Sequence, residues 1–224
     1  MNLRPFKNKK VNEYMNHVYR FLFIVLLVLG AYTMSYSTHF IPANNSFIQY
    51  YGRWDMTDSL HPRHSWPGVY LSAEFSGTSI GIRMRDSANY YNVYIDGKFL
   101  KVLHGTITGE ADYLLADSLA NTHHTLLFSK RNIMFDAVFS VSGLLLDEGA
   151  ALFPPPAKPE RKIEFIGDSF TVGSANEWTS PAPAPNDSYT NTYKSFGPMI
   201  ARNSPFLILR LMSERTGTSR LPSR

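Results

Sequence analysis

The sequence contains no cysteine among its 224 residues. Disulfide frameworks, thiolate nucleophiles, cysteine-ligated metal sites and a bacterial lipoprotein anchor are therefore excluded. Charged residues are also few, at 18%, and the net charge of +4 comes from the two ends of the chain. Residues 1–20 carry +4 and residues 204–224 carry +3, which leaves −3 for the residues between them. Nucleic-acid binding would need a basic face on the folded part, so we do not expect it.

An unbroken apolar run, Phe21–Ala31, follows a basic leader. A membrane-spanning helix needs about 20 apolar residues, so this shorter run is typical of the core of an export signal. No small-x-small cleavage site follows it, so an uncleaved anchor stays open, as does a buried helix. We expect residues 1–38 to be a signal peptide or N-terminal anchor and the protein to be exported, either periplasmic or secreted. Any membrane contact is expected only through residues 21–31.

Short runs of alternating apolar and polar residues fill residues 47–153. Val69–Phe75 and Ile80–Met84 show the period of two that is typical of half-buried strands. Asp96 and Gly97 form a strong hairpin signal, because both residues tolerate positive φ. Further strands are expected over residues 91–95, 99–103, 126–128 and 139–145. Seven or eight short strands predict a mostly β fold, a jelly-roll β-sandwich, rather than a helical domain.

Four prolines between residues 154 and 159 interrupt this pattern, and residues 154–160 are expected to be a linker between domains. Beyond it, residues 162–173 run from a short buried strand into a tight turn that carries Ser169. Residues 179–192 are rich in Pro, Ser and Asn, which predicts a surface loop. A helix is expected near Ser195, with Pro198 in its first turn and with Met199 and Ile200 facing inward.

Ser169 is the candidate nucleophile, because a strand-to-turn junction holds a side chain rigidly at the end of a sheet. A serine hydroxyl needs a base within hydrogen-bond reach, usually His, and donors for the oxyanion. Ser169 could supply one donor from its own N–H. We expect Gly167 to give the turn freedom and Asp168 to fix it through nearby backbone N–H groups. A Gly-Asp-Ser tripeptide also arises by chance, so the tripeptide alone does not establish catalysis.

The blocks around this turn carry a family resemblance. Residues 163–173, with Asn176 and Glu177 nearby, resemble the first motif block of the GDSL or SGNH hydrolases. Blocks upstream and downstream are similar, in the same order, to the carbohydrate esterase family 2 branch, which has an N-terminal jelly roll. They are residues 51–54, 65–68, 90–97, 124–126 and 195–202. The resemblance covers about residues 47–203.

The resemblance implies hydrolysis of acetyl esters on plant polysaccharides such as xylan or mannan, without metal or cofactor. It assigns Ser169 as nucleophile and first oxyanion donor, with Asp168 supporting the turn. The family's oxyanion Gly, oxyanion Asn and C-terminal His blocks have no match here, and all seven histidines precede Ser169. We therefore expect residues 161–203 to be an incomplete, truncated and inactive hydrolase domain. Residues 204–224 are expected to be a disordered tail that resembles read-through in a shifted frame.

Other interpretations stay open. The pairs His61/His64 and His123/His124 could supply a base, since a triad is recognised by geometry, but their place in the jelly-roll blocks favours structural roles. Asp58 with His61 and His64 hints at a metal site, against which Pro62 argues, so no metal is expected. Trp178 could stack on a sugar ring or pack in the fold. Two alternative functions are a non-catalytic β-sandwich that binds carbohydrate or a partner, and a membrane-anchored structural protein.

Overall fold

The chain divides into two units, residues 1–37 and residues 38–224. The computed structural model describes Met15 and residues 17–22, 38–134, 139–158, 160–179, 181, 187–203 and 209–213, the last range as backbone only. In the first unit the described residues are helical, and most of the apolar run at 21–31 lies outside them. Within the described ranges, no helix combines the length and the apolar character needed to cross a membrane.

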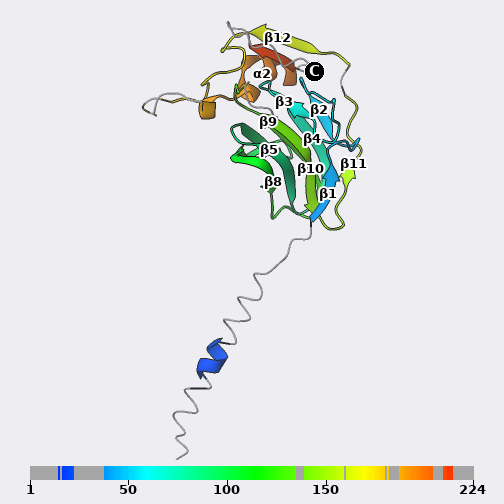
Figure 1. Cartoon of the computed structure of the whole chain (residues 1–224), viewed down its shortest axis with the longest axis vertical. Coiled ribbons are helices and arrows are strands. Elements are labelled where there is room, and N and C mark those ends of the chain that lie inside the picture. Colours follow the sequence, from blue (N-terminus) through cyan, green and yellow to red (C-terminus); the bar gives the residue numbers. More distant parts are fainter. Residues whose placement is uncertain are drawn as a thin grey trace, which may run out of the picture. The chain divides into compact units, whose positions relative to one another are not determined.

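Two antiparallel sheets form the main body of the second unit (Figure 1). The first sheet has the order β1-β10-β5-β8, with β3 also paired to β10, and the second has the order β11-β4-β9-β6-β7, with β2 also paired to β4. The first contains β1 Thr38–Pro42, β3 Arg63–His64, β5 Ile80–Asp86, β8 Ile107–Ala116 and β10 Phe139–Asp147. The second contains β2 Gln49–Tyr51, β4 Tyr70–Gly77, β6 Tyr90–Ile95, β7 Lys98–His104, β9 Thr122–Lys130 and β11 Leu152–Phe153. The predicted mostly β sandwich is confirmed.

The core lies between the two sheets and follows the alternation in the sequence. In β4, Leu71, Ala73 and Phe75 are buried, whereas Ser72 and Glu74 are only half-buried on the outer face. Strands with one buried face separate apolar from polar residues in this way because successive side chains point to opposite sides of the sheet. The strands predicted from the alternation over 69–75 and 80–84 are therefore confirmed as β4 and β5.

The hairpin between β6 and β7 turns at Asp96 and Gly97, as predicted. Their φ angles are 52° and 71°, so both residues adopt the left-handed conformation that a two-residue hairpin of this kind requires. The register pairs Ile95 with Lys98. The turn places β6 and β7 side by side at one edge of the second sheet.

The sandwich begins at β1, upstream of the expected start at residue 47. This strand pairs along its whole length with β10, from Thr38 opposite Asp147 to Pro42 opposite Gly143. The approach at its end is close, since a Cβ on Gly143 would lie 2.1 Å from the Ile41 carbonyl oxygen. Strand β1 has only five residues, and its partner β10 lies about a hundred positions later in the chain. So short a strand, paired with so distant a segment, leaves little signal in the local sequence. The sequence therefore does not predict this edge of the sandwich.

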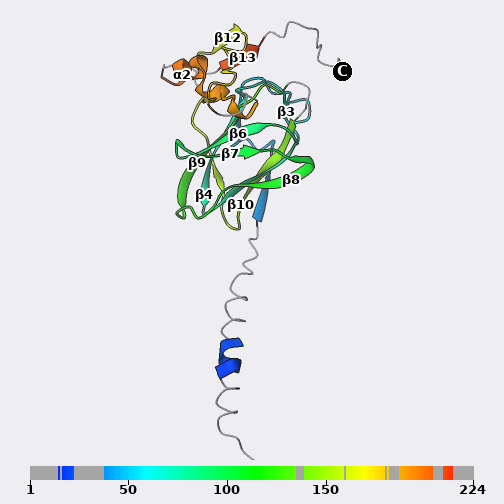
Figure 2. The ribbon, with the colours of Figure 1, turned by 90° about the vertical axis from the view of Figure 1, so that its left-hand side faces the viewer.

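The residues after the linker form a small α/β piece at one end of the sandwich (Figure 2). It contains β12 Ile163–Gly167, the 3-10 helices η1 Asp187–Tyr189 and η2 Thr192–Lys194, helix α2 Phe196–Arg202 and β13 Leu209–Ser213. Strands β12 and β13 run parallel, from Ile163 opposite Leu209 to Gly167 opposite Ser213. A strand, a helix and a parallel strand make one βαβ unit. Sequence analysis predicted the first strand, the turn and the helix but not β13; the other residues of the 204–224 tail lie outside the described ranges.

The residues of helix α2 that face β12 differ from those predicted. Met199 and Ile200 are 48% and 51% exposed, so the prediction that they face inward is wrong. Gly197, Pro198 and Ala201 are buried instead. A Cβ on Gly197 would lie 2.9 Å from Cδ2 of Phe165, so only glycine lets the helix approach β12 this closely. The helix therefore packs through its small residues, and not through its largest apolar ones.

The segment 179–192 also differs in part from the predicted surface loop. Thr190, Asn191 and Thr192 are buried, with exposed fractions of 1%, 1% and 0%. Their polar groups are compatible with burial because they form hydrogen bonds, such as that from Thr192 Oγ1 to the Arg131 carbonyl oxygen at 2.7 Å. The prediction is thus wrong for these three residues, and residues 180 and 182–186 lie outside the described ranges.

Candidate active site

Ser169 lies in the turn directly after β12, and its side chain is exposed. The Asp168 carboxylate accepts a hydrogen bond from the Phe170 N–H at 2.9 Å, and the Ser169 carbonyl accepts one from the Ser174 N–H at 2.8 Å. The Asp168 carboxylate therefore binds the backbone of the turn that carries Ser169. Within the described ranges, the Ser169 N–H donates to no other group, which leaves it available to a developing oxyanion.

Gly167 has a different role from the one expected. Its φ lies outside the left-handed region, so the turn does not use its conformational freedom. A Cβ at this position would instead lie 2.0 Å from Oγ1 of Thr171, which is buried. Glycine is required because the chain after Ser169 folds back against the end of β12. Positive φ angles occur later in this loop, 68° at Gly173 and 53° at Ala175.

Arg131, directly after β9, connects the sandwich with the serine loop. Its side chain is 4% exposed, and Nη2 donates to Oε2 of Glu177. Nη2 also donates to the Ser188 carbonyl at 3.1 Å, and Nε donates to the Thr190 carbonyl at 3.3 Å. Nη1 donates to Oδ1 of Asn92, on β6, at 3.0 Å. One guanidinium thus binds the sandwich, the serine loop and the segment before η2.

Asn191 completes this buried polar network. Its carbonyl Oδ1 accepts from Nδ2 of Asn92 at 2.9 Å, and its own Nδ2 donates to Oε1 of Glu177 at 2.9 Å. The backbone of Asn191 exchanges two hydrogen bonds with the Asn176 side chain, at 2.9 and 3.0 Å. Lys194 adds an ion pair to Glu177 at 2.7 Å. Buried polar groups satisfied in this way specify one geometry for the loop that carries Ser169.

Most of this network has no signal in the sequence. The sequence places Asn176 and Glu177 beside the serine motif, but no pattern in it points to Arg131, Asn92 or Asn191. Their contacts join positions far apart in the chain, such as Asn92 with Asn191, and neither strand nor helix periodicity reports such contacts. The only available signal was the Asn-Glu pair that accompanies Ser169.

His61 and His64 have different partners, and in the described ranges no contact joins either side chain to Ser169. His61 Nδ1 lies 2.9 Å from the Asp58 carboxylate at the surface. His64 is buried in the sandwich, where its ring packs edge-on against Trp54 with centroids 4.5 Å apart. Among the described residues, no group of three or more His, Cys, Asp or Glu side chains could hold a metal ion.

The second pair, His123/His124, also makes structural contacts. His123 Nε2 lies 2.9 Å from the Glu74 carboxylate. His124 is buried, with Nδ1 2.8 Å from Oδ2 of Asp96 and Nε2 2.7 Å from the Ala120 carbonyl oxygen. His64 and His124 are thus buried in the sandwich, whereas His61 and His123 are solvated at its surface. No contact in the described ranges joins any of them to Ser169.

Trp178, the candidate sugar-stacking residue, lies at the end of the serine loop. The residue is 41% exposed, and its backbone N–H donates to the Ala175 carbonyl at 3.0 Å. Phe170, directly after the serine, is 84% exposed. The serine loop therefore carries two exposed aromatic residues, and stacking by Trp178 stays a prediction.

The family model described as carbohydrate esterase 2 N-terminal matches residues 50–156. The chain is 30% identical over 162 residues to the cellulase/esterase CelE of Acetivibrio thermocellus, a match that covers 71% of the chain and 20% of CelE. It is 34% identical over 143 residues to an acetylxylan esterase / glucomannan deacetylase of Cellvibrio japonicus, covering 62% of the chain and 38% of that protein. The chain therefore spans much less than the full length of these relatives.

Solved structures give the same result. A family two carbohydrate esterase from Clostridium thermocellum, in complex with cellohexaose, matches with a TM-score of 0.68 and 28% identity over 74% of the chain and 50% of that protein. A family two carbohydrate esterase from Cellvibrio japonicus matches with a TM-score of 0.70 and 24% identity, covering 78% of the chain and 52% of that protein. The second match supports the fold alone. The resemblance to this esterase family is confirmed.

Proposed function

We propose that the protein is an exported acetyl-ester hydrolase of the carbohydrate esterase family 2 type, acting on plant polysaccharide of the acetylxylan or acetylmannan type. The match of residues 50–156 to the carbohydrate esterase 2 N-terminal family model supports this proposal. Ser169 is the proposed nucleophile. The observation that carries the proposal is the turn after β12, in which Ser169 is exposed and its N–H has no partner in the described ranges. Similarity to esterases named for acetylxylan and glucomannan supports the substrate class.

In the proposed reaction, Oγ of Ser169 attacks the carbonyl carbon of an acetyl ester. The carbonyl oxygen becomes an oxyanion, which the Ser169 N–H stabilises, and collapse releases the sugar hydroxyl and leaves an acetyl-serine. Water then releases acetate and restores the serine. Asp168 contributes by holding the turn through the hydrogen bond that its carboxylate accepts from the Phe170 N–H. Gly167 contributes because it has no Cβ, which leaves room for Thr171 beside β12.

Within the described ranges, no contact joins a general base to the Ser169 hydroxyl. No histidine follows Ser169 in the sequence, His61 and His123 pair with carboxylates at the surface, and His64 and His124 are buried in the sandwich. We propose that these 224 residues alone hydrolyse acetyl esters slowly or not at all, for lack of this base. Added imidazole should then raise the hydrolysis of 4-nitrophenyl acetate, because it can accept the Ser169 proton.

Ser169→Ala is the control for the imidazole experiment, because it keeps the loop and removes only the hydroxyl. The proposal expects an imidazole-dependent rate in the unchanged protein above the rate in Ser169→Ala, and release of acetate from acetylated xylan under the same conditions. Equal rates in the two proteins at every imidazole concentration would contradict the assignment of Ser169 as nucleophile.

A second candidate function is carbohydrate binding without turnover. Two complete sheets enclose one core in the sandwich, whereas the α/β piece contains only β12, β13 and short helices in the described ranges. Binding of oligosaccharide that is unaffected by Ser169→Ala, without ester hydrolysis, would favour this candidate.

Export rests on the basic leader and the apolar run at residues 21–31. The start of the sandwich at Thr38 supports it, because cleavage before this residue would leave every strand of both sheets intact. N-terminal sequencing of the exported protein tests the proposal. A mature start between Tyr32 and Thr38 is expected for a cleaved signal, and an intact Met1 would indicate a permanent anchor.

A further inference from the structure

The outer face of the second sheet carries a groove of about 240 Å³. Its floor is a row of side chains across three adjacent strands, since Ser72 on β4 pairs with Leu127 on β9, and Leu127 pairs with Tyr94 on β6. The next row contains Glu74 opposite Thr125. These side chains point away from the core, because the residues between them, Ala73 and Leu126, are 2% and 1% exposed. We call this space the Tyr94 groove.

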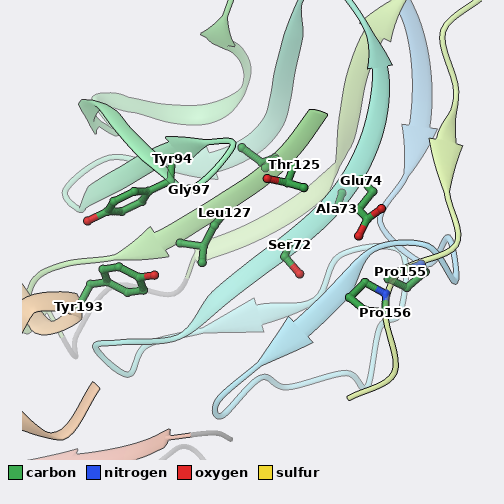
Figure 3. Close-up of a pocket in the computed structure, with 11 residues that line it drawn as sticks. Ser72, Ala73, Glu74, Tyr94, Gly97, Thr125, Leu127, Pro155, Pro156 and Tyr193 are labelled. Atoms are coloured by element: carbon green, nitrogen blue, oxygen red, sulfur yellow. The ribbon is translucent and has the colours of Figure 1, made fainter. Parts of the chain in front are cut away.

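One wall of the Tyr94 groove is aromatic. Tyr94 and Tyr193 lie with their ring centroids 4.9 Å apart and their planes at 46° (Figure 3). Arg202 holds Tyr193 in place, since its guanidinium carbon lies 3.9 Å from the ring centroid and its Nη1 donates to the Tyr193 carbonyl at 2.7 Å. The Tyr193 hydroxyl points toward the floor at Leu127 and Ser72 (Figure 3). The wall is therefore preorganised, which lowers the entropy cost of binding.

The opposite wall comes from the linker between the two folded parts. Pro155 and Pro156 line the groove there. The Pro156 carbonyl accepts a hydrogen bond from Nε2 of Gln49 at 2.9 Å, and Nζ of Lys158 donates to the Tyr50 carbonyl at 3.1 Å. The linker is thus bound along β2, and the groove has two fixed walls.

The chemistry of the groove selects an uncharged ligand that has both apolar and hydroxyl surfaces. Tyrosine, leucine and proline surfaces suit the C–H face of a sugar ring, and the hydroxyls of Ser72 and Thr125 suit its hydroxyl groups. The Glu74 carboxylate, held by His123 at 2.9 Å, can accept hydrogen bonds from sugar hydroxyls and would repel an anionic ligand. The volume is below the about 300–1,000 Å³ usual for drug-sized ligands, so a short saccharide segment fits rather than a long one.

We propose that the Tyr94 groove binds a neutral oligosaccharide at a site separate from Ser169. The proposal rests on the proposed function for its ligand class, because a chain that acts on polysaccharide would gain affinity from a second contact with the same polymer. No lining residue belongs to the serine turn. Linking two weak sites in this way raises the overall affinity without strengthening either site.

The test measures binding of cellohexaose and xylohexaose by calorimetry to the Ser169→Ala chain, so that no turnover disturbs the measurement. Tyr94→Ala and Tyr193→Ala should each weaken binding and raise the dissociation constant about tenfold or more. Tyr90→Ala is the matched control, because Tyr90 lies on the same strand, stacks on His104 with centroids 4.0 Å apart and does not line the groove. It should bind as the parent does.

Thr125→Lys gives an independent variant, since Thr125 is exposed and a longer side chain there fills the groove with little risk to folding. It should also weaken binding, and a hexamer of galacturonate should bind more weakly than either neutral probe.

The proposal is overturned if neither neutral hexaose binds, if Tyr94→Ala and Thr125→Lys bind as tightly as Tyr90→Ala, or if the acidic hexamer binds as tightly as the neutral ones. Binding that depends on Tyr94, in a chain whose imidazole-dependent ester hydrolysis does not exceed that of Ser169→Ala, would count against the esterase alone. Imidazole-dependent hydrolysis above that of Ser169→Ala without such binding would count against the groove alone.

Discussion

Arg131 and Glu177 form an ion pair that joins the sandwich to the loop of the candidate nucleophile. The Arg131 side chain is 4% exposed and the Glu177 side chain 28%. Both oxygens of Glu177 are used, Oε2 by Arg131 and Oε1 by Asn191 and Lys194. The jelly roll is therefore the support on which the serine loop is built.

Removing the carboxylate of Glu177 should destabilise the chain strongly. The Glu177 side chain is 28% exposed and Arg131 keeps its other acceptors, so the loss should be smaller than the about 3–5 kcal/mol of a fully buried pair. We expect Glu177→Ala to lower the free energy of unfolding by about 1–3 kcal/mol in urea denaturation, and Glu177→Gln by less, because the amide oxygen can still accept a hydrogen bond. In a double-mutant cycle with Arg131→Ala, the two losses should not add. Additive losses would mean that the pair does not couple the two parts.

Gly167→Ala should disturb the serine turn. The new Cβ would lie 2.0 Å from Oγ1 and 3.0 Å from Cβ of Thr171, so the chain must shift. A loss of roughly 1–3 kcal/mol in the free energy of unfolding is expected. Adding Thr171→Ala removes the closest atom and should restore part of the loss. Gly109→Ala is the control, because a Cβ there meets nothing within 4 Å. Equal effects of Gly167→Ala and Gly109→Ala would contradict the steric explanation.

The sequence predicts the parts of this fold that depend on local pattern. The alternation in β4 and the hairpin pair Asp96-Gly97 can each be recognised from a few consecutive residues, and both features appear in the structure. Strand β1 depends on pairing with β10, and β13 on parallel pairing with β12, so the sequence near each carries little signal.

The candidate site divides in the same way. The bond of Asp168 to the turn is a local contact and could be predicted. The steric need for Gly167 depends on where Thr171 folds, and the inward face of α2 depends on the approach of Phe165 to Gly197. Arg131, Asn92 and Asn191 meet only after two sheets and a loop have assembled. Such contacts follow from tertiary packing, which overrides local propensity.

His124 should make the stability of the sandwich depend on pH. The Ala120 carbonyl and then the Asp96 carboxylate accept from its ring nitrogens and raise the pKa of His124 above its usual value. A raised pKa contributes stability that is complete below the unfolded value, about 6.5, and is lost as the pH rises through the higher folded pKa. The free energy of unfolding of the unchanged chain should therefore exceed that of His124→Gln at pH 5.5, and the difference should shrink at alkaline pH. His123→Gln is the neighbouring control. A difference between the unchanged chain and His124→Gln that grows with pH would refute this sign.

Lys130 should give a pH dependence of the opposite sign. Its side chain is fully buried and donates to the carbonyl oxygens of Ser65 and Met134, with Nζ 5.1 Å from the centroid of the Phe139 ring. Burial lowers the pKa of Lys130 to about 7, because leaving water disfavours the charged form. Between that value and the unfolded pKa of about 10.4, the unfolded chain binds more protons than the folded chain, so the stability rises with pH.

Lys130→Met removes the titration and nearly keeps the shape of the side chain, so it supplies the baseline for this effect. The free energy of unfolding of the unchanged chain, minus that of Lys130→Met, should rise from pH 7 to about pH 10 in urea denaturation. Lys98→Met, at an exposed position in β7, controls for the general loss of positive charge and should show no such rise. A flat difference for Lys130→Met over this range would mean that the buried amine stays charged in the folded chain. In that case the two carbonyl contacts and the Phe139 ring would stabilise the ammonium enough to offset its burial.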